Sequence, residues 1–126
     1  MDNPSQDSPH HRKKVLVIDL TSDGRNIYPS LISSESQYMG ANSMEEGIQK
    51  TRLENPTIVF IAAEVLDEKA CDEIRELRQS YSGIIISWCL DVCSAEIILT
   101  AGSNFHFPAP PYTILDVVKH IRTLVI

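Results

Sequence analysis

The sequence predicts an α/β fold, a three-layer (βα)5 flavodoxin-like sandwich with a parallel five-stranded sheet in the order 2-1-3-4-5. The first observation is that continuous apolar runs recur at residues 15–18, 58–61 and 84–86. Runs without alternation are typical of strands buried on both faces, as in a parallel sheet. The second is that amphipathic segments separate these runs, which favours helices packed on both faces of the sheet. Right-handed crossovers between parallel strands then favour the flavodoxin-like strand order.

Five strands are expected in chain order. The first covers residues 14–19, KVLVID, and ends on an acid, and the second is the weaker run SQYM at 36–39. The third is IVFI at 58–61 and the fourth is III at 84–86. The fifth is the short aromatic run FHF at 105–107. Ligands of such sheets bind at the carboxyl ends of the strands, so the residues that end the strands are the candidate site residues.

Three of the expected helices begin at a recognisable capping residue. Ser43 and Glu46 form the S-x-x-E capping box. Ser94 is expected to cap a later helix, which Gly102 ends, and Thr113 is expected to cap the last one. These signals place the helix boundaries between the predicted strands.

The buried faces of the helices follow from the spacing of their apolar residues. A further helix near residues 24–34 accommodates Pro29 only in its first turn. The residues expected to face the core are Met44, Ile48, Leu53, Ile74, Leu77, Tyr81, Ile97, Ile98, Ala101, Ile114, Val117, Val118, Ile121 and Val125.

Length and composition indicate one domain at residues 13–126 after a polar, flexible tail at 1–12 that carries two prolines. A net charge of -6 argues against nucleic-acid contact by this domain, because phosphate binding needs clustered Lys and Arg. The three cysteines have no framework spacing and no signal-peptide pattern opens the chain, which favours the cytoplasm. The longest apolar run, 83–90, is far shorter than the roughly 20 residues that span a bilayer, so we expect no membrane contact.

Four segments resemble response-regulator receiver (CheY-like) domains of two-component signalling, and the resemblance covers nearly all of residues 14–126. They are KKVLVID at the first strand, NPTIVFI at the third, AGSNFHF before the fifth, and ILDVVKHIRTLV at the last helix. The resemblance implies a phosphoryl group carried on an aspartate that ends the third strand. It also implies Mg²⁺ held by that aspartate, by an acidic pair after the first strand and by a loop carbonyl. A hydroxyl that ends the fourth strand and a lysine that ends the fifth would bind the phosphoryl oxygens. Such a site needs the cation and the donors because negative charge converges on a carboxylate nucleophile.

This chain departs from that pattern at each position. The phosphoacceptor position falls on Ala62, or on Ala63 if the register shifts by one, and Leu20 replaces the second acid beside Asp19. The position of the hydroxyl on the fourth strand falls on Trp88, and the neighbouring Ser87 points to the opposite face of that strand. The position of the lysine on the fifth strand falls on Pro108 or Ala109. The resemblance therefore implies a degenerate pseudo-receiver with no catalytic residues, no metal and no cofactor.

Two residues of this degenerate phosphorylation pocket each have two possible roles. Asp19 is expected to cap the loop after the first strand. The alternative is that Asp19 binds a cation together with Glu64, whose carboxylate is expected to lie nearby. Trp88 either fills the vacated pocket or serves as an ordinary core aromatic, and the sequence does not separate the two roles.

The segment FHFPAPPY at residues 105–112 is the most distinctive part of the chain. In the resemblance, Phe105 matches the aromatic that moves on phosphorylation, and the face built by the fourth helix, the fifth strand and the last helix docks partners or forms dimers. Three prolines stiffen the segment, which favours a preformed recognition surface, although they also suit the start of the last helix. The candidate contacts on this interaction face are Glu96, Phe105, His106, Tyr112 and Lys119.

The leading hypothesis is a non-catalytic regulatory module that acts through protein–protein contact, with a protein partner, an attached output domain or a second copy of itself. It suits the N-terminal part of a larger response regulator or transcription activator. One alternative is a phosphorylatable receiver that uses Asp19 with Glu64 or Asp91. Another is a small-molecule-sensing flavodoxin-like domain, but the segment LTSDGR after the first strand has one glycine and forms no phosphate loop.

Overall fold

The computed structural model describes residues 13–21, 36–91 and 94–125. The predicted tail at 1–12 and the predicted helix near 24–34 lie outside these residues. Five strands and four helices follow one another along the described chain: β2 (Lys13–Leu20), β3 (Ser36–Ala41), α2 (Met44–Glu54), β4 (Ile58–Ala63), α3 (Glu68–Ser80), β5 (Ile84–Cys89), α4 (Ala95–Ala101), β6 (Phe105–Pro108) and α5 (Ile114–Val125).

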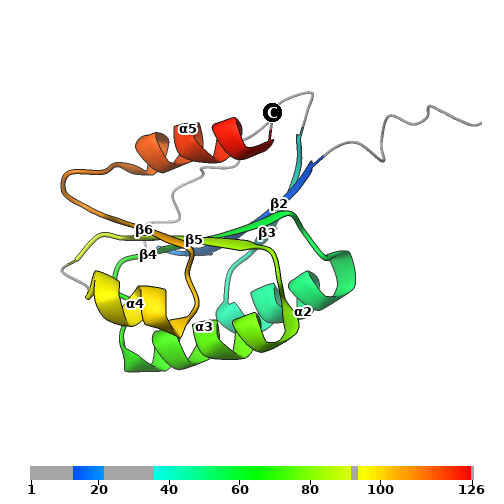
Figure 1. Cartoon of the computed structure of the whole chain (residues 1–126), viewed down its shortest axis with the longest axis horizontal. Coiled ribbons are helices and arrows are strands. Elements are labelled where there is room, and N and C mark those ends of the chain that lie inside the picture. Colours follow the sequence, from blue (N-terminus) through cyan, green and yellow to red (C-terminus); the bar gives the residue numbers. More distant parts are fainter. Residues whose placement is uncertain (1–12, 22–35, 92–93, 126) are drawn as a thin grey trace, which may run out of the picture.

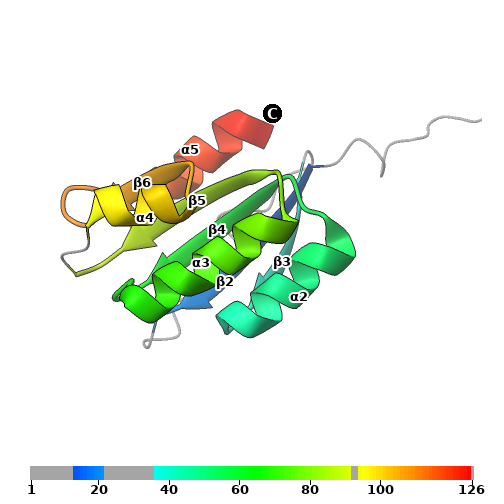
Figure 2. The ribbon, with the colours of Figure 1, turned by 60° about the horizontal axis from the view of Figure 1, so that its bottom comes forward.

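The strands form one parallel sheet in the order β3-β2-β4-β5-β6. Counted along the chain, this is the order 2-1-3-4-5, so the predicted fold class is confirmed. Helix α5 covers one face of the sheet, and α2, α3 and α4 lie side by side on the other (Figure 1, Figure 2). The layers of a helix–sheet–helix sandwich are therefore present.

Each face of the sheet has its own hydrophobic core, because successive strand residues point to opposite faces. The core under α2, α3 and α4 is built on Leu16, Ile18, Val59, Ile61, Ala63, Ile85 and Cys89. The core under α5 is built on Val15, Val17, Ile58, Phe60, Ala62, Ile86 and Trp88. Burial of all six residues of β4 agrees with its place at the centre of the sheet.

The predicted capping residues begin their helices. Ser43 Oγ accepts a hydrogen bond from the N–H of Glu46 at 3.1 Å, and the Glu46 carboxylate accepts one from the N–H of Asn42 at 2.9 Å. Ser94 caps α4, and Thr113 forms a reciprocal pair of hydrogen bonds with Asp116 at the start of α5. These bonds satisfy backbone donors that have no partner within the helix.

Two residues predicted to face the core do not. Leu53 is 81% exposed, because the buried stripe of α2 runs through Met44, Ile48 and Thr51 and Leu53 lies off it. Ile97 is 52% exposed, because the short helix α4 turns Ile98 toward the sheet.

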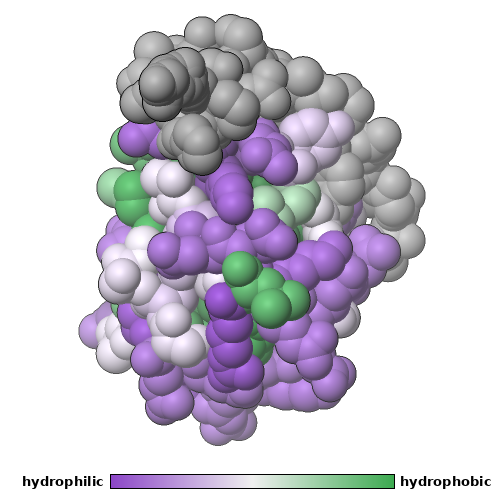
Figure 3. Space-filling model, turned by 90° about the vertical axis from the view of Figure 1, so that its right-hand side faces the viewer, coloured by the Kyte–Doolittle hydropathy of each residue, from purple (hydrophilic) through white to green (hydrophobic). Residues whose placement is uncertain are grey.

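Hydrophilic side chains predominate on the face at the amino ends of the strands, where hydrophobic ones form only small patches (Figure 3). None of the four helices in the described part of the chain has the length and apolar character needed to cross a bilayer.

Arg78, near the end of α3, joins three segments of the fold. Its guanidinium donates to the carbonyls of Tyr81 and Gly83 at 2.8 and 2.9 Å. It also donates to the carbonyl of Gly102 at 2.9 Å and to Oδ1 of Asn104 at 2.8 Å. Gly102 ends α4 with a φ of 138°, a conformation that L side chains rarely adopt. One half-buried side chain thus ties the end of α3 to the starts of β5 and β6.

Replacing Arg78 is expected to destabilise the fold. Arg78→Ala should lower the free energy of unfolding by about 2–3 kcal/mol, because several partly buried acceptors lose a charged donor. Arg75→Ala is the matched control on the same helix, since Arg75 forms only an exposed ion pair with Asp72; we expect a loss below about 1 kcal/mol. Urea unfolding followed by circular dichroism measures both. Equal losses for the two variants would contradict the role given to Arg78.

Candidate functional site

The register of the parallel strands sets which side chains meet at the carboxyl edge of the sheet. One row runs through Asp19, Ala62, Trp88 and Phe107, which are direct neighbours on adjacent strands. Ala62 and Trp88 belong to the core under α5, so this row faces α5.

The next row runs through Leu20, Ala63, Cys89 and Pro108. Ala63 and Cys89 belong to the core under α2, α3 and α4, so this row lies on the opposite face. Both placements considered for the acceptor position, Ala62 and Ala63, are thus at the sheet edge. In the two rows together, Asp19 is the one carboxylate, and neither row holds a hydroxyl or an amine.

Trp88 is buried in the row that faces α5. Its exposed fraction is 2%, and its Nε1–H donates to the carbonyl of Tyr112 at 3.0 Å. A buried indole commonly satisfies its N–H in this way. Trp88 therefore neighbours Ala62 on the adjacent strand, and its indole ties the segment that leads into α5 to β5.

The carboxylate of Asp19 is occupied by a local contact. Its Oδ1 accepts hydrogen bonds from the N–H of Thr21 at 3.1 Å and from the Thr21 hydroxyl at 2.6 Å. Asp19 therefore caps the turn after β2, as the sequence predicts. Glu64 follows β4, and its carbonyl accepts a hydrogen bond from the N–H of Asp91 at 2.8 Å. Within residues 13–21, 36–91 and 94–125, no three His, Cys, Asp or Glu side chains gather in a group that could hold a metal ion.

A buried polar cluster holds β6 to β5 on the face under α4. Ser87 Oγ lies 2.8 Å from His106 Nδ1 and 3.0 Å from Ser103 Oγ, and Ser103 Oγ lies 2.8 Å from the carbonyl of Phe105. In one order that satisfies every donor, Ser103 donates to that carbonyl, Ser87 donates to Ser103, and the Nδ1–H tautomer of His106 donates to Ser87. This order pairs every donor and leaves the lone pair of His106 Nε2 buried with no partner among the described residues.

Burial has an electrostatic consequence for His106. Loss of hydration lowers the pKa of its imidazole below the ordinary value of 6.5. Burial therefore favours the neutral form of His106 in the folded chain.

The opposite face of β6 carries an aromatic cluster that the sequence did not predict. His120 of α5 contacts the rings of Phe105 and Phe107, with centroids 5.1 and 5.2 Å apart. Phe107 also contacts the ring of Tyr112 at 5.1 Å, edge to face. Phe105 and Phe107 are two residues apart on a strand, and residues at that spacing point to the same face of the sheet. The sequence could therefore have predicted that their rings lie on one face. His120 was hidden because it lies beside the apolar stripe of α5 rather than in it.

The predicted interaction face is brought together only in part. Phe105 and Tyr112 are both partly exposed at the aromatic cluster, and Lys119 is exposed on α5. Glu96 is exposed on α4. His106, by contrast, points to the other face of β6 from Phe105, where it bonds to Ser87.

The cysteines differ in state. Cys71 is a buried free thiol, whereas Cys89 is disulfide-bonded. Disulfides persist mainly in oxidising compartments, so this bond weakens the argument for a reducing compartment that the cysteine spacing supplied.

Solved structures of response regulators are similar to the chain. An orphan response regulator from H. pylori has a TM-score of 0.72 and 18% identity, over 92% of this chain and 98% of its own. A response regulator from Thermotoga maritima has a TM-score of 0.72 and 15% identity, over 90% of this chain and 98% of its own. A probable two-component system response regulator/GGDEF domain protein has a TM-score of 0.70 and 18% identity, over 90% of this chain and 49% of its own.

No sequence-family model matches the chain, and no curated protein matches it by sequence. The similarity is therefore one of structure. The chain has the fold of response-regulator receiver domains.

Proposed function

We propose that the chain is a regulatory receiver-like module that acts through protein contacts and does not depend on phosphorylation. The observation that carries the proposal is the pair of rows at the carboxyl edge, in which Asp19 is the one carboxylate. An alanine methyl at the acceptor position offers no nucleophile. Asp19 is already bonded to Thr21, and hard cations need several oxygen ligands.

We further propose that Trp88 occupies the space that a phosphoryl group and its donors would need. The buried indole lies in the same row as Ala62, and its N–H is satisfied by the Tyr112 carbonyl. Because Trp88 fills this edge and is hydrogen-bonded to Tyr112, we expect the segment before α5 to keep one conformation. Close-packed interiors resist partial rearrangement. The module would then present its surface without an activating step.

The surface proposed for contact is the β6–α5 face, which we define by Phe105, Tyr112, Leu115 and Lys119. The first three are large apolar or aromatic side chains left exposed on the fold. Phe105 and Tyr112 are backed by ring contacts to His120 and Phe107, so they lose little side-chain entropy on binding. Rigid aromatic side chains of this kind are enriched at interface hot spots.

The occupant proposed for this face is an attached output domain or a second copy of the chain. The matched response regulator/GGDEF domain protein supports the first, because the matched part is 49% of that protein. A role as the N-terminal regulatory domain of a larger regulator, such as a transcription activator, follows the same logic.

A magnesium and beryllofluoride titration tests the loss of phosphorylation. In amide NMR spectra, the resonances of Asp19, Ala62, Glu64 and Trp88 are expected to stay fixed, because the acceptor position holds an alanine, which cannot bind the phosphate mimic. A phosphorylatable receiver domain in the same buffer shows that the reagent is active. Shifts at these four residues that spread to β6 would instead support a receiver with a displaced acidic site.

Sedimentation equilibrium tests the homodimer form of the contact. Tyr112→Asp is expected to weaken self-association about 10-fold or more, because it places a charge on the β6–α5 face. Leu53→Asp is the control, since Leu53 is exposed on α2 across the sheet. A dimer that survives Tyr112→Asp would locate the contact elsewhere, and a strict monomer would favour an attached output domain.

Acid is expected to loosen β6 from β5. The pKa of His106 is lowered in the folded chain, so its contribution to stability is fully present above the ordinary value of 6.5 and is lost as pH falls toward the folded pKa. Urea unfolding at about pH 7.5 and about pH 5.5 should show this loss, and His106→Gln should reduce it. An imidazole that titrates above its ordinary range in NMR would overturn the argument.

A further inference from the structure

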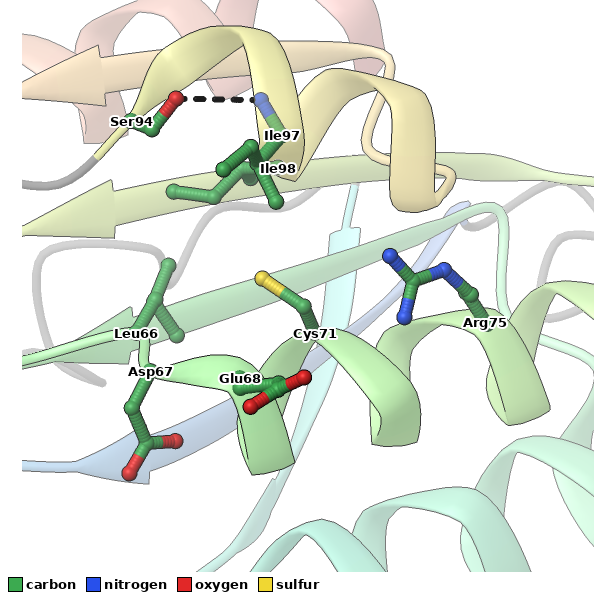
Figure 4. A pocket seen from close by; sticks show the side chains of 8 residues that line it. All are labelled: Leu66, Asp67, Glu68, Cys71, Arg75, Ser94, Ile97 and Ile98. Atoms are coloured by element: carbon green, nitrogen blue, oxygen red, sulfur yellow. Dashed lines mark hydrogen bonds between the residues drawn. The ribbon is translucent and has the colours of Figure 1, made fainter.

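A cavity lies between α3 and α4, away from the carboxyl-edge rows and from the β6–α5 face (Figure 4). Its volume is about 450 Å³, within the range of sites that hold a ligand or a partner's side chain. The lining comes from the loop after β4, from the first turns of α3 and from the start of α4. The lining residues are Leu66, Asp67, Glu68, Cys71, Arg75, Ser94, Ile97 and Ile98.

The floor of the cavity is apolar. Leu66, Cys71 and Ile98 are buried, and the Cys71 sulfur points toward α4 (Figure 4). Burial raises the pKa of the Cys71 thiol, so the group is protonated near neutral pH and behaves as a small hydrophobic side chain. Ile97, exposed on the side of α4, extends the apolar lining to the surface. An inserted apolar side chain would bury its own surface here together with that of Ile97.

The apolar surface continues beyond the cavity. Val65 precedes Leu66 and is exposed, and Leu90 is exposed on the loop after β5. The two loops are held together by hydrogen bonds from the N–H of Leu90 to the carbonyl of Ala63 at 3.1 Å and from the N–H of Asp91 to that of Glu64 at 2.8 Å. A small molecule inside the cavity would leave Val65 and Leu90 uncovered, whereas a polypeptide segment would cover them.

The charges around the cavity favour a cationic occupant. Arg75 forms an ion pair with Asp72, so these two charges cancel. Asp67 and Glu68 remain at the start of α3, and Glu96 is exposed on α4 next to Ile97. The whole chain carries a net charge of -6, which adds long-range attraction for a basic segment.

We propose that the α3–α4 cavity is a docking site for a basic polypeptide segment of a partner protein. The segment inserts one apolar side chain against Leu66, Cys71 and Ile98, and places lysine or arginine near Glu68 and Glu96. Its backbone crosses the exposed Val65 and Leu90.

Peptide display tests the proposal with the intact chain. A library of random peptides is selected against the wild-type protein, and enriched peptides are synthesised and their binding measured by fluorescence anisotropy. We expect an apolar residue flanked by Lys or Arg. Ile97→Asp should weaken binding about 10-fold or more, since it places a charge at the cavity mouth. Leu99→Asp is the matched control, because Leu99 is 43% exposed on the same helix and does not line the cavity.

A charge reversal gives a second, independent readout. Glu68→Lys should weaken the enriched peptides, whereas Glu73→Lys on the same helix, which lines the groove between α2 and α3, should leave binding within about 2-fold. Thermal unfolding confirms that each variant is folded. Glu68, Ile97 and Leu99 are exposed and Glu73 is half-buried, so the fold is expected to persist.

Several outcomes would overturn the proposal. They are an absence of enriched peptides, enrichment of acidic peptides, and binding that Ile97→Asp and Leu99→Asp reduce equally. Self-association of the protein alone that Ile97→Asp abolishes would identify a second copy as the occupant. A hexylamine titration followed by amide NMR tests for a small ligand. Saturable shifts of the Cys71 and Ile98 resonances, with the Val65 and Leu90 resonances unchanged, would identify a small amphipathic amine as the occupant instead.

Discussion

The in-register parallel pairing of β2, β4, β5 and β6 sets the position of every side chain at the carboxyl edge. Backbone hydrogen bonds join the strands, and the apolar side chains that the strands direct to the two cores specify this register. A slip of one residue would exchange the row that contains Ala62 with the row that contains Ala63 and would turn each apolar set to the wrong face. The two buried cores therefore fix which side chains lie at the edge. Side chains at the edge that are not part of either core can therefore differ without a change in the geometry of the sheet.

Strand β6 connects the two faces of the sheet at its outer end. On one face, neutral His106 closes a chain of hydrogen bonds through Ser87 and Ser103. On the other, Phe105 and Phe107 pack against His120 of α5. A strand of four residues has few ladder hydrogen bonds of its own, so these side-chain contacts contribute much of its attachment. The shape of the β6–α5 face thus depends on a polar cluster that lies on the opposite side of the sheet.

The sequence predicted the features that depend on local pattern. Apolar runs identified the strands, and the capping residues Ser43, Ser94 and Thr113 identified three helix starts, because a strand or a cap is specified by neighbours in the chain. Leu53 and Ile97 were predicted to face the core but are exposed. Periodicity gives the spacing of the apolar residues on a helix, but it does not show how much of that face the neighbouring elements cover. His120, and the bond between His106 and Ser87, depend on contacts between elements distant in the chain. The α3–α4 cavity depends on the separation of two helices, which no local pattern encodes.

The end of β4 links the carboxyl edge to the α3–α4 cavity. Ala62 lies in the row that faces α5, and four residues later Leu66 forms part of the cavity floor. In a receiver that is phosphorylated, the strand end carries the charge that changes. Here the same strand end carries a buried methyl, and the loop that follows delivers apolar side chains to the surface. A partner bound in the cavity would act on the edge only to the extent that it binds one arrangement of this loop better than another. The hydrogen bonds that join the loops after β4 and β5 restrict such arrangements.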